Sequence, residues 1–216
     1  MTKTTTDLQA VLFDYGQVLS GPPDPAAWER MRDALQASEK LFHEAYWRYR
    51  NDYDMGILNA PSYWGAVANL LGQQLSLDLL KKLVDADVDL WTQPNQEMID
   101  WAAALQRAGY KTGILSNIGD AMESGVLDRL AWMNDFAHHT FSHRTGTAKP
   151  EAVIYTLAME GLGVAPEHIL FVDDREENIT AARAAGMTAI RYADHSSFVK
   201  SMREAGLEEL LTPQPR

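Results

Sequence analysis

Four places in this sequence carry polar side chains whose types could do chemistry together. Three of them follow short apolar runs, and the fourth is a lysine that precedes a proline. In order they are Asp14, Ser116 with Asn117, Lys149, and Asp173 with Asp174. Each has an ordinary structural explanation when taken alone, because Asp and Ser also begin turns and cap helices. Together they amount to three carboxylates, an ammonium group, a hydroxyl and an amide.

The carboxylates point to a divalent cation. Two carboxylates about 4 Å apart repel each other by roughly 4 kcal/mol at an effective dielectric of 20. Mg²⁺ removes this repulsion, because it binds oxygen ligands and is usually shared with the oxygens of a substrate phosphate. We therefore predict a Mg²⁺ site that contains Asp14 and the pair Asp173 and Asp174. The backbone carbonyl of Gly16 could supply a further ligand.

A bound phosphate group would give roles to the other side chains. Asp14 would keep one oxygen free to attack phosphorus, which is the arrangement for covalent catalysis through an aspartyl-phosphate. Lys149 and Ser116 would hold the remaining phosphate oxygens. Lys149 and the cation would also keep Asp14 ionised and stabilise the charge of the transferring group. The predicted catalytic set is Asp14, Ser116, Asn117 and Lys149.

The spacing of apolar residues predicts the elements that would bring these groups together. A short apolar run near the start, and further ones after residue 94, alternate with helical patterns and read as strands. The expected strands cover residues 8–13, 111–117, 138–141, 169–172 and 188–190. Strands separated by helices favour a parallel sheet with helices on both faces. Ligands bind at the carboxyl ends of such strands, so Asp14, Ser116 and Asp173 should share one edge of the sheet.

Residues 26–90 follow a different pattern, with helical periodicity and no strand. We expect three or four amphipathic helices, one with an aromatic stripe that we interpret as core. The stripe consists of Phe42, Tyr46, Tyr49 and Tyr53. The pattern leaves open whether part of it, or the neighbouring Arg48 or Arg50, faces a substrate. We predict an α/β fold in which residues 1–20 and 92–216 form the core and residues 21–91 an inserted helical domain.

The composition limits the kinds of molecule that this protein is expected to bind. The chain has 216 residues, a net charge of −11, a pI near 4.9 and no cysteine. A protein this acidic is not expected to bind nucleic acid through a broad basic face, and the lack of cysteine excludes disulfides and thiolate metal sites. The polar residues 1–7 do not resemble a signal peptide, and no apolar stretch reaches the ~20 residues that span a bilayer. We expect a cytoplasmic protein with a small-molecule partner and no membrane partner, whereas the oligomeric state cannot be read from the sequence.

Four ordered motifs in the chain resemble those of the haloacid dehalogenase (HAD) superfamily. They are Phe13-Asp14-x-Gly16-x-Val18-Leu19, Leu115-Ser116-Asn117, Lys149-Pro150, and Val172-Asp173-Asp174 with Asn178-Ile179. The resemblance implies a Rossmann-like core, a mobile helical cap of the C1 type and, most often, Mg²⁺-dependent phosphatase activity. It also implies that Asp14 is the nucleophile, that Ser116 binds phosphate and that Lys149 steadies both. Asp174 matches the metal-binding Asp of the family, and Asp173 matches the partner that supports it.

Position 16 departs from the family pattern, because family phosphatases usually carry a second Asp there as general acid and base. Gly16 has no such group, and general acid–base help is typically worth ~10²–10⁴ in rate. The lack of a general acid should slow hydrolysis of an anomeric sugar phosphate, an acyl phosphate or a phenolic ester less than hydrolysis of esters with poor leaving groups. The form Asp14-x-Gly16-x-Val18 resembles the subgroup that contains α-D-glucose-1-phosphate phosphatase. We therefore hypothesise a sugar-1-phosphate-like substrate.

Two other functions fit parts of the sequence. A 2-haloacid dehalogenase would also use Asp14 as its nucleophile and needs no general acid. It needs no cation either, however, so Asp173 beside Asp174 would be an electrostatic burden. Related dehalogenases also tend to carry a Tyr two residues after the nucleophile, whereas Tyr15 follows it directly. The second alternative is a non-catalytic family member that binds a metabolite or a protein, and Gly16 is its only support.

Overall fold

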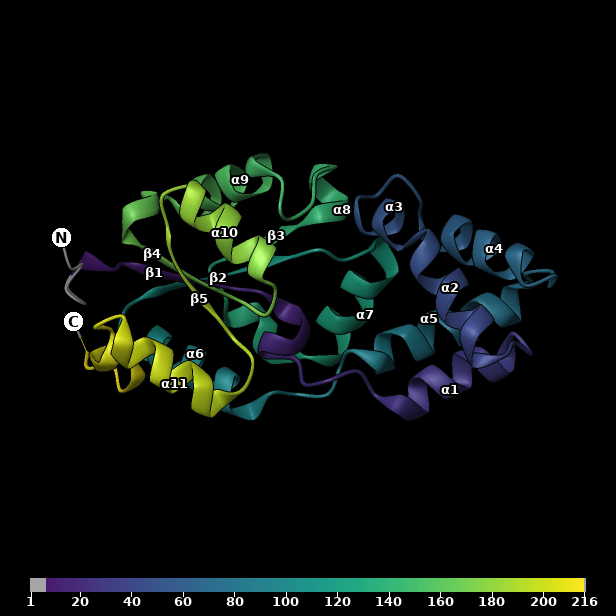
Figure 1. Ribbon diagram of the computed structural model, residues 1–216, viewed down its shortest axis with the longest axis horizontal. Helices are drawn as coiled ribbons and strands as arrows, with labels where there is room; N and C mark the ends of the chain where they lie inside the picture. Colours follow the sequence, from purple (N-terminus) through teal and green to yellow (C-terminus); the bar gives the residue numbers. More distant parts are fainter. Residues whose placement is uncertain (1–6, 216) are drawn as a thin grey trace.

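A computed structural model of the chain describes residues 7–215 and contains a five-stranded sheet (Figure 1). The strands are β1 (Ala10–Phe13), β2 (Lys111–Ser116), β3 (His138–Phe141), β4 (Ile169–Asp173) and β5 (Thr188–Arg191), in the spatial order β3-β2-β1-β4-β5. Their four pairings are all parallel, which confirms the predicted sheet. The polar segment 1–6, which we expected not to be a signal peptide, and Arg216 lie outside the described residues. Within the described part, no helix is long and apolar enough to cross a membrane.

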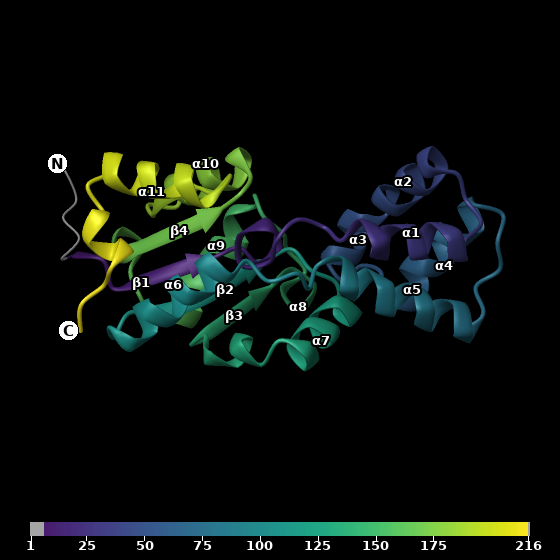
Figure 2. The ribbon, with the colours of Figure 1, turned by 90° about the horizontal axis from the view of Figure 1, so that it is seen from below.

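Helices cover both faces of the sheet (Figures 1 and 2). They are α9 (Ala152–Leu162) and α10 (Glu176–Ala184) on one face, and α6 (Gln96–Arg107) and α11 (His195–Glu204) on the other. Alternate residues of β1 enter two different apolar cores, as the two-residue period of a strand requires. Ala10 and Leu12 join the core of α9 and α10, whereas Val11 and Phe13 join the core of α6 and α11. Burial on both sides explains why this strand is apolar without alternation.

A bundle of helices lies beyond the carboxyl ends of the strands, on the right in both ribbon views (Figures 1 and 2). It contains α1 (Pro25–Ala34), α2 (Glu39–Arg48), α3 (Arg50–Asp54), α4 (Ala60–Leu70) and α5 (Leu77–Leu90). We expected three or four helices, and a fifth arises because the backbone of Tyr49 leaves helical geometry and separates α2 from α3. The aromatic stripe belongs to the core of this bundle, since Phe42, Tyr46 and Tyr53 are buried and Tyr49 is half-buried.

Local sequence sets where the helices of this bundle begin. Four of them start after a polar residue whose side chain accepts a hydrogen bond from a backbone amide of the first turn. These residues are Asp24, Ser38, Asn59 and Ser76. We propose that residues 21–91 form one unit, the cap, and that residues 1–20 and 92–216 form the core. The grouping of α1 to α5 away from the sheet supports this division.

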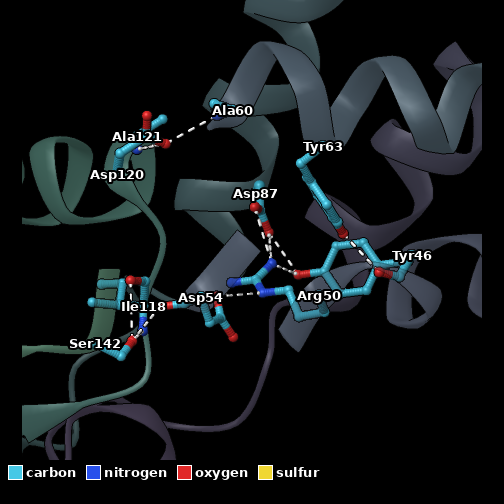
Figure 3. Close-up of polar contacts among 10 residues, drawn as sticks. All are labelled: Tyr46, Arg50, Asp54, Ala60, Tyr63, Asp87, Ile118, Asp120, Ala121 and Ser142. Carbon is cyan, nitrogen blue, oxygen red and sulfur yellow. Dashed lines mark hydrogen bonds and ion pairs between the residues drawn. The ribbon is translucent and has the colours of Figure 1, made fainter. Parts of the chain in front are cut away.

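The cap contacts the core through the region of α3 and the start of α4. The hydroxyl of Ser142 donates to the backbone carbonyl of Asp54 and accepts a hydrogen bond from the amide of Ile118 at 2.9 Å (Figure 3). The amide of Ala60 donates to Asp120 Oδ1 at 3.0 Å (Figure 3). These two links hold α3 next to the segment that follows β2.

A third contact joins α5 of the cap to α7 (Asp120–Arg129) of the core. Gly125 of α7 faces Val88, which is buried. A β-carbon at position 125 would lie 2.4 Å from Val88 Cγ2, a distance that real side chains do not adopt. The two helices therefore approach each other closely because residue 125 has no side chain.

We predict that Gly125→Ala destabilises the protein although alanine favours helices. Alanine is about 1 kcal/mol better than glycine in a helix interior, but overpacking of this kind typically costs about 1–3 kcal/mol. The free energy of unfolding, measured by urea denaturation, should therefore fall. Gly65→Ala in α4 is the matched control, because its β-carbon would meet no neighbouring atom closer than 3.9 Å, and it should stabilise. An equal gain from both substitutions would mean that α5 and α7 do not pack this closely.

Candidate active site

The predicted site forms around the Lys149 ammonium, which is buried between two carboxylates. Its Nζ lies 2.8 Å from Asp14 Oδ1 and 2.7 Å from Asp173 Oδ2. The sheet creates this arrangement, because β1 and β4 are neighbours and the Asp14 amide donates to the Val172 carbonyl at 2.8 Å. Burial acts to lower the pKa of Lys149, but the two carboxylates raise it above its usual value. The lysine therefore stays charged inside the protein.

Asp14 has one oxygen bound and one free. Its Oδ1 faces Lys149 and accepts a hydrogen bond from the Tyr15 amide at 2.6 Å, whereas no group among residues 7–215 donates to Oδ2. Burial raises the pKa of Asp14 to about 7; Lys149 acts to lower it, and Asp173 and Asp174 act to raise it further. A cation beside these carboxylates would favour the ionised form.

The three aspartates form a cluster that is suited to a hard cation. Asp14, Asp173 and Asp174 each offer an oxygen, and these oxygens lie within 4.8 Å of one another. Their three negative charges exceed the single positive charge of Lys149, so the like charges repel unless a cation or a proton is added. Carboxylate oxygens are also the ligands that Mg²⁺ prefers.

The two adjacent aspartates differ in how much of their carboxylate the protein already uses. Both oxygens of Asp173 are occupied: Oδ2 faces Lys149, and Oδ1 accepts hydrogen bonds from the Arg175 amide and from Asn178 Nδ2, both at 2.9 Å. Asp174 accepts one side-chain hydrogen bond, from Gln17 Nε2 at 3.1 Å, and is half-buried. Asp174 is therefore free to bind a ligand, whereas Asp173 holds its neighbours in place.

The backbone conformation at position 16 does not require a glycine. The Gly16 backbone lies at φ −64° and ψ 126°, a conformation open to every L-residue. A β-carbon would meet Trp91 Cζ3 at 3.9 Å, which is an ordinary contact, and no closer atom. The site could therefore accommodate a side chain at this position, and its absence is a chemical feature of the cavity.

The structure gives different roles to Ser116 and Asn117. Ser116 is buried at the end of β2, and it lines the cavity that Asp14 also lines. The side chain of Asn117 instead holds the backbone of Lys149 on both sides. Its Nδ2 donates to the Lys149 carbonyl at 2.9 Å, and its Oδ1 accepts from the Lys149 amide at 2.8 Å. Asn117 therefore positions the lysine.

A cavity of about 440 Å³ lies over these residues and is lined on the cap side by Trp47, Arg50, Asn51 and Asp54. The sequence pattern leaves open whether Arg48 or Arg50 faces a substrate. The structure places Arg50 at the cavity, whereas Arg48 is exposed and does not line it. Trp47, Asn51 and Asp54 were missed, as was Trp91. No spacing in the sequence marks them, because they reach the cavity only when the cap packs on the core.

Arg50 is the centre of a buried polar network in the cap (Figure 3). Its Nε donates to Asp54 Oδ1 at 3.0 Å, and its Nη1 donates to Asp87 at 3.2 Å and to the hydroxyl of Tyr46. Tyr46 in turn donates to Asp87 at 2.7 Å, and the guanidinium also lies over the Tyr53 ring. The paired charges satisfy each other, which is what allows an arginine to be buried here.

Several curated proteins are similar to this chain. The pig bifunctional epoxide hydrolase 2 is 24% identical over 95% of the chain, and the chain spans 40% of that protein's length. A phosphorylated carbohydrates phosphatase from Thermotoga maritima is 26% identical, with 85% of the chain and 92% of the relative covered. An (S)-2-haloacid dehalogenase from Pseudomonas is 30% identical, with 85% and 84% covered.

Solved structures share the fold. A HAD family enzyme from Bacteroides thetaiotaomicron, solved with magnesium and inorganic phosphate, superposes with a TM-score of 0.69 at 19% identity. The alignment covers 86% of this chain and 94% of that one. The match confirms the Rossmann-like α/β architecture expected from the resemblance.

The family follows from the sequence as a whole. A model of the haloacid dehalogenase-like hydrolases matches residues 8–186. This range contains the cap and every residue of the predicted site, from Asp14 to Asp174. The protein is therefore a member of the haloacid dehalogenase-like hydrolase family and an enzyme of the hydrolase class.

Proposed function

We propose that the protein is a cytoplasmic, Mg²⁺-dependent phosphatase that hydrolyses a small phosphorylated metabolite through an aspartyl-phosphate on Asp14. The observation that carries this proposal is the buried Asp14–Lys149–Asp173 cluster with Asp174 beside it. Three carboxylates around one ammonium leave an excess of negative charge that a dehalogenation site would not need. A phosphatase uses it, because the cation that offsets the charge also binds the transferred phosphate.

The donor set fits Mg²⁺. Asp14 and Asp174 have carboxylate oxygens that the protein leaves free, and we propose them as ligands together with the Gly16 carbonyl. Asp173, which we also placed in the metal site, supports it through the hydrogen bonds that already use both of its oxygens. The cation would offset the charge of the carboxylates and of the substrate phosphate.

Asp14, Lys149 and Ser116 of the core then have different roles in the reaction. The free oxygen of Asp14 attacks phosphorus, and the bond from phosphorus to the departing oxygen breaks. Lys149 holds the nucleophile in place, and Lys149 and the Ser116 hydroxyl stabilise the phosphoryl oxygens. Attack of water on phosphorus then breaks the bond to Asp14 and releases phosphate, which returns the carboxylate to its starting state.

We propose a sugar phosphate as the substrate. The cavity of about 440 Å³ is large enough for a phosphorylated monosaccharide. Trp47 and Trp91 line it, and indole rings provide flat apolar surfaces that suit the carbon–hydrogen face of a sugar. The relative from Thermotoga maritima is named for phosphorylated carbohydrates. The sugar-1-phosphate hypothesis rests on Gly16, since a good leaving group needs no proton.

Dehalogenation is the second candidate, because the Pseudomonas haloacid dehalogenase is 30% identical over most of both chains. Such an enzyme could use Asp14 on carbon instead of phosphorus. The environment of Asp174 argues against dehalogenation, because burial and the charge of Asp173 raise the pKa of Asp174. A site without a cation would therefore keep this carboxylate ionised only at a cost in free energy. The substrate class therefore decides between the two candidates.

We predict that phosphate release requires Mg²⁺ and that halide release does not occur. A panel of sugar phosphates and 2-haloacids should show phosphate production that stops when EDTA removes the metal and returns when Mg²⁺ is restored. No chloride should be released from 2-chloropropionate with or without Mg²⁺. Chloride release in EDTA, with no phosphatase activity, would establish the dehalogenase instead.

We predict that Asp14→Asn abolishes phosphate release and leaves the fold intact. Removal of a nucleophile lowers kcat by about 10⁴-fold or more, and Lys149 keeps its second partner, Asp173. Phosphate assays and circular dichroism measure the two effects. Asp128→Asn, at an exposed position of α7, is the control and should have full activity. Activity retained by Asp14→Asn would show that another group attacks phosphorus.

We predict that Mg²⁺ alone stabilises the protein and that Asp174→Asn removes the effect. A ligand at 100 times its Kd stabilises the folded state by about 2.7 kcal/mol, so Tm should rise with Mg²⁺ in a thermal-shift assay. Without the metal, Asp174→Asn should be at least as stable as the natural protein, because one like charge is lost from the cluster. An unchanged Mg²⁺ shift in Asp174→Asn would place the cation elsewhere.

A further inference from the structure

A phosphate ester with a poor leaving group needs a proton on the departing oxygen, and among the described residues on the core side of the cavity the carboxyl groups are those of Asp14 and Asp174, the proposed nucleophile and cation ligand. Lys149 is paired with two carboxylates, and Asp174 belongs to the proposed cation site. The Tyr15 hydroxyl donates to the Trp91 carbonyl at 2.7 Å, and burial raises its pKa. Gly16 has no side chain. The proton must come from another lining group or from water.

Asp54 lines the same cavity from the cap side, at the last position of α3. Its Oδ1 accepts a hydrogen bond from Arg50 Nε at 3.0 Å. No group among residues 7–215 donates to its Oδ2, and 15% of the side chain is exposed. The carboxyl therefore has one oxygen anchored in the cap network and the other available to a ligand.

The backbone of Asp54 is fixed close to the phosphate-binding end of β2. Its carbonyl accepts a hydrogen bond from Ser142, and Ser142 accepts one from Ile118, two residues after Ser116. Figure 3 shows Asp54 between Arg50 on the cap side and the Ile118–Ser142 pair on the core side. Asp54, Asp14 and Ser116 line one cavity, so a ligand whose phosphate lies at Ser116 and Asp14 shares that cavity with the Asp54 carboxyl.

The surroundings of Asp54 suit a group that gives and takes a proton near neutral pH. Burial raises its pKa to about 6, Arg50 in α3 acts to lower it, and Asp87 in α5 acts to raise it. His143 in α8 (Ser142–Thr145) also faces it and acts in the same direction as Arg50. Catalytic acids and bases work best when the pKa is near the working pH, because both forms are then populated.

We propose that Asp54 is the general acid and base of this active site and supplies from the cap the carboxyl group that position 16 lacks. The proposal rests on the phosphatase function. In the first step the Asp54 Oδ2 proton moves to the leaving oxygen as the Asp14–phosphorus bond forms and the ester bond breaks. In the second step Asp54 takes a proton from water as the water oxygen bonds to phosphorus and the bond to Asp14 breaks.

An active Asp54 changes the expected substrate range. The restriction to sugar 1-phosphates followed from the missing acid at Gly16. With a proton donor on the cap, esters of ordinary primary alcohols become substrates too. Substrate selection would then depend on contacts between the sugar and the aromatic lining of the cavity. It would not depend on how readily the leaving group departs.

The test compares esters that differ in their need for a proton. Asp54→Asn should lower kcat/KM for glycerol 3-phosphate by about 10²-fold or more and leave p-nitrophenyl phosphate nearly unchanged, because nitrophenolate departs without protonation. Gly16→Asp, added to Asp54→Asn, should restore part of the activity on glycerol 3-phosphate. Asp52→Asn is the matched control, since Asp52 lies in the same helix and does not line the cavity, and it should change neither rate.

Two results would overturn the role of Asp54. An equal loss on both esters would show that Asp54 only holds Arg50, and unchanged rates on both would show that the proton has another source. If Asp54→Asn does not fold, the natural protein still decides, because general acid catalysis makes log kcat/KM depend only weakly on leaving-group pKa across a series of esters. A steep dependence would exclude the proposal.

The same assays separate this inference from the proposed function. If the natural protein releases no phosphate from any ester with Mg²⁺ present, the phosphatase proposal fails. If it releases phosphate and only the predicted difference between the two esters is missing, the phosphatase proposal stands and the role of Asp54 is wrong.

Discussion

The site depends on one buried ammonium group that lies between two carboxylates. Lys149 has almost no contact with water, and a buried charge that loses its ion-pair partner typically costs about 3–5 kcal/mol. The parallel pairing of β1 with β4 brings both Asp14 and Asp173 next to the ammonium, so one carboxylate still offsets it when the other is lost. Asn117 completes the arrangement because it binds the Lys149 backbone from both sides. The fold thus places the proposed nucleophile, Asp14, before any ligand arrives.

The same constraint explains the charge that the lysine does not balance. One ammonium group offsets one carboxylate, and burial with Asp173 and Asp174 keeps the pKa of Asp14 raised to about 7 despite Lys149. Under the proposed mechanism Asp14 must be ionised, which a further positive charge would favour. The proposed cation is therefore supported by the balance of charges as well as by the oxygen ligands.

Much of this core could be predicted from the sequence, because each signal was local. The apolar run before Asp14 and the one before Asp173 end where the strands end, and parallel topology then forces both carboxylates to one edge. The role of Asn117 could not be predicted, since strand-end amides have many uses. Asp54 and Trp47 were missed for a different reason. Their place at the cavity depends on how the inserted helices dock, and periodicity describes one helix at a time.

The position of Asp54 on the cap has a consequence for how the enzyme would work. A carboxyl group at position 16 would be part of the core and would stay beside the nucleophile whether or not the cap is in place. Asp54 instead reaches the cavity through α3, which is held by the Ser142 bridge and by the contact of Ala60 with Asp120. Proton supply and exclusion of water from the aspartyl-phosphate would then depend on the same contacts. Under the Asp54 proposal, a weaker cap–core interface should slow esters with poor leaving groups more than esters with good ones.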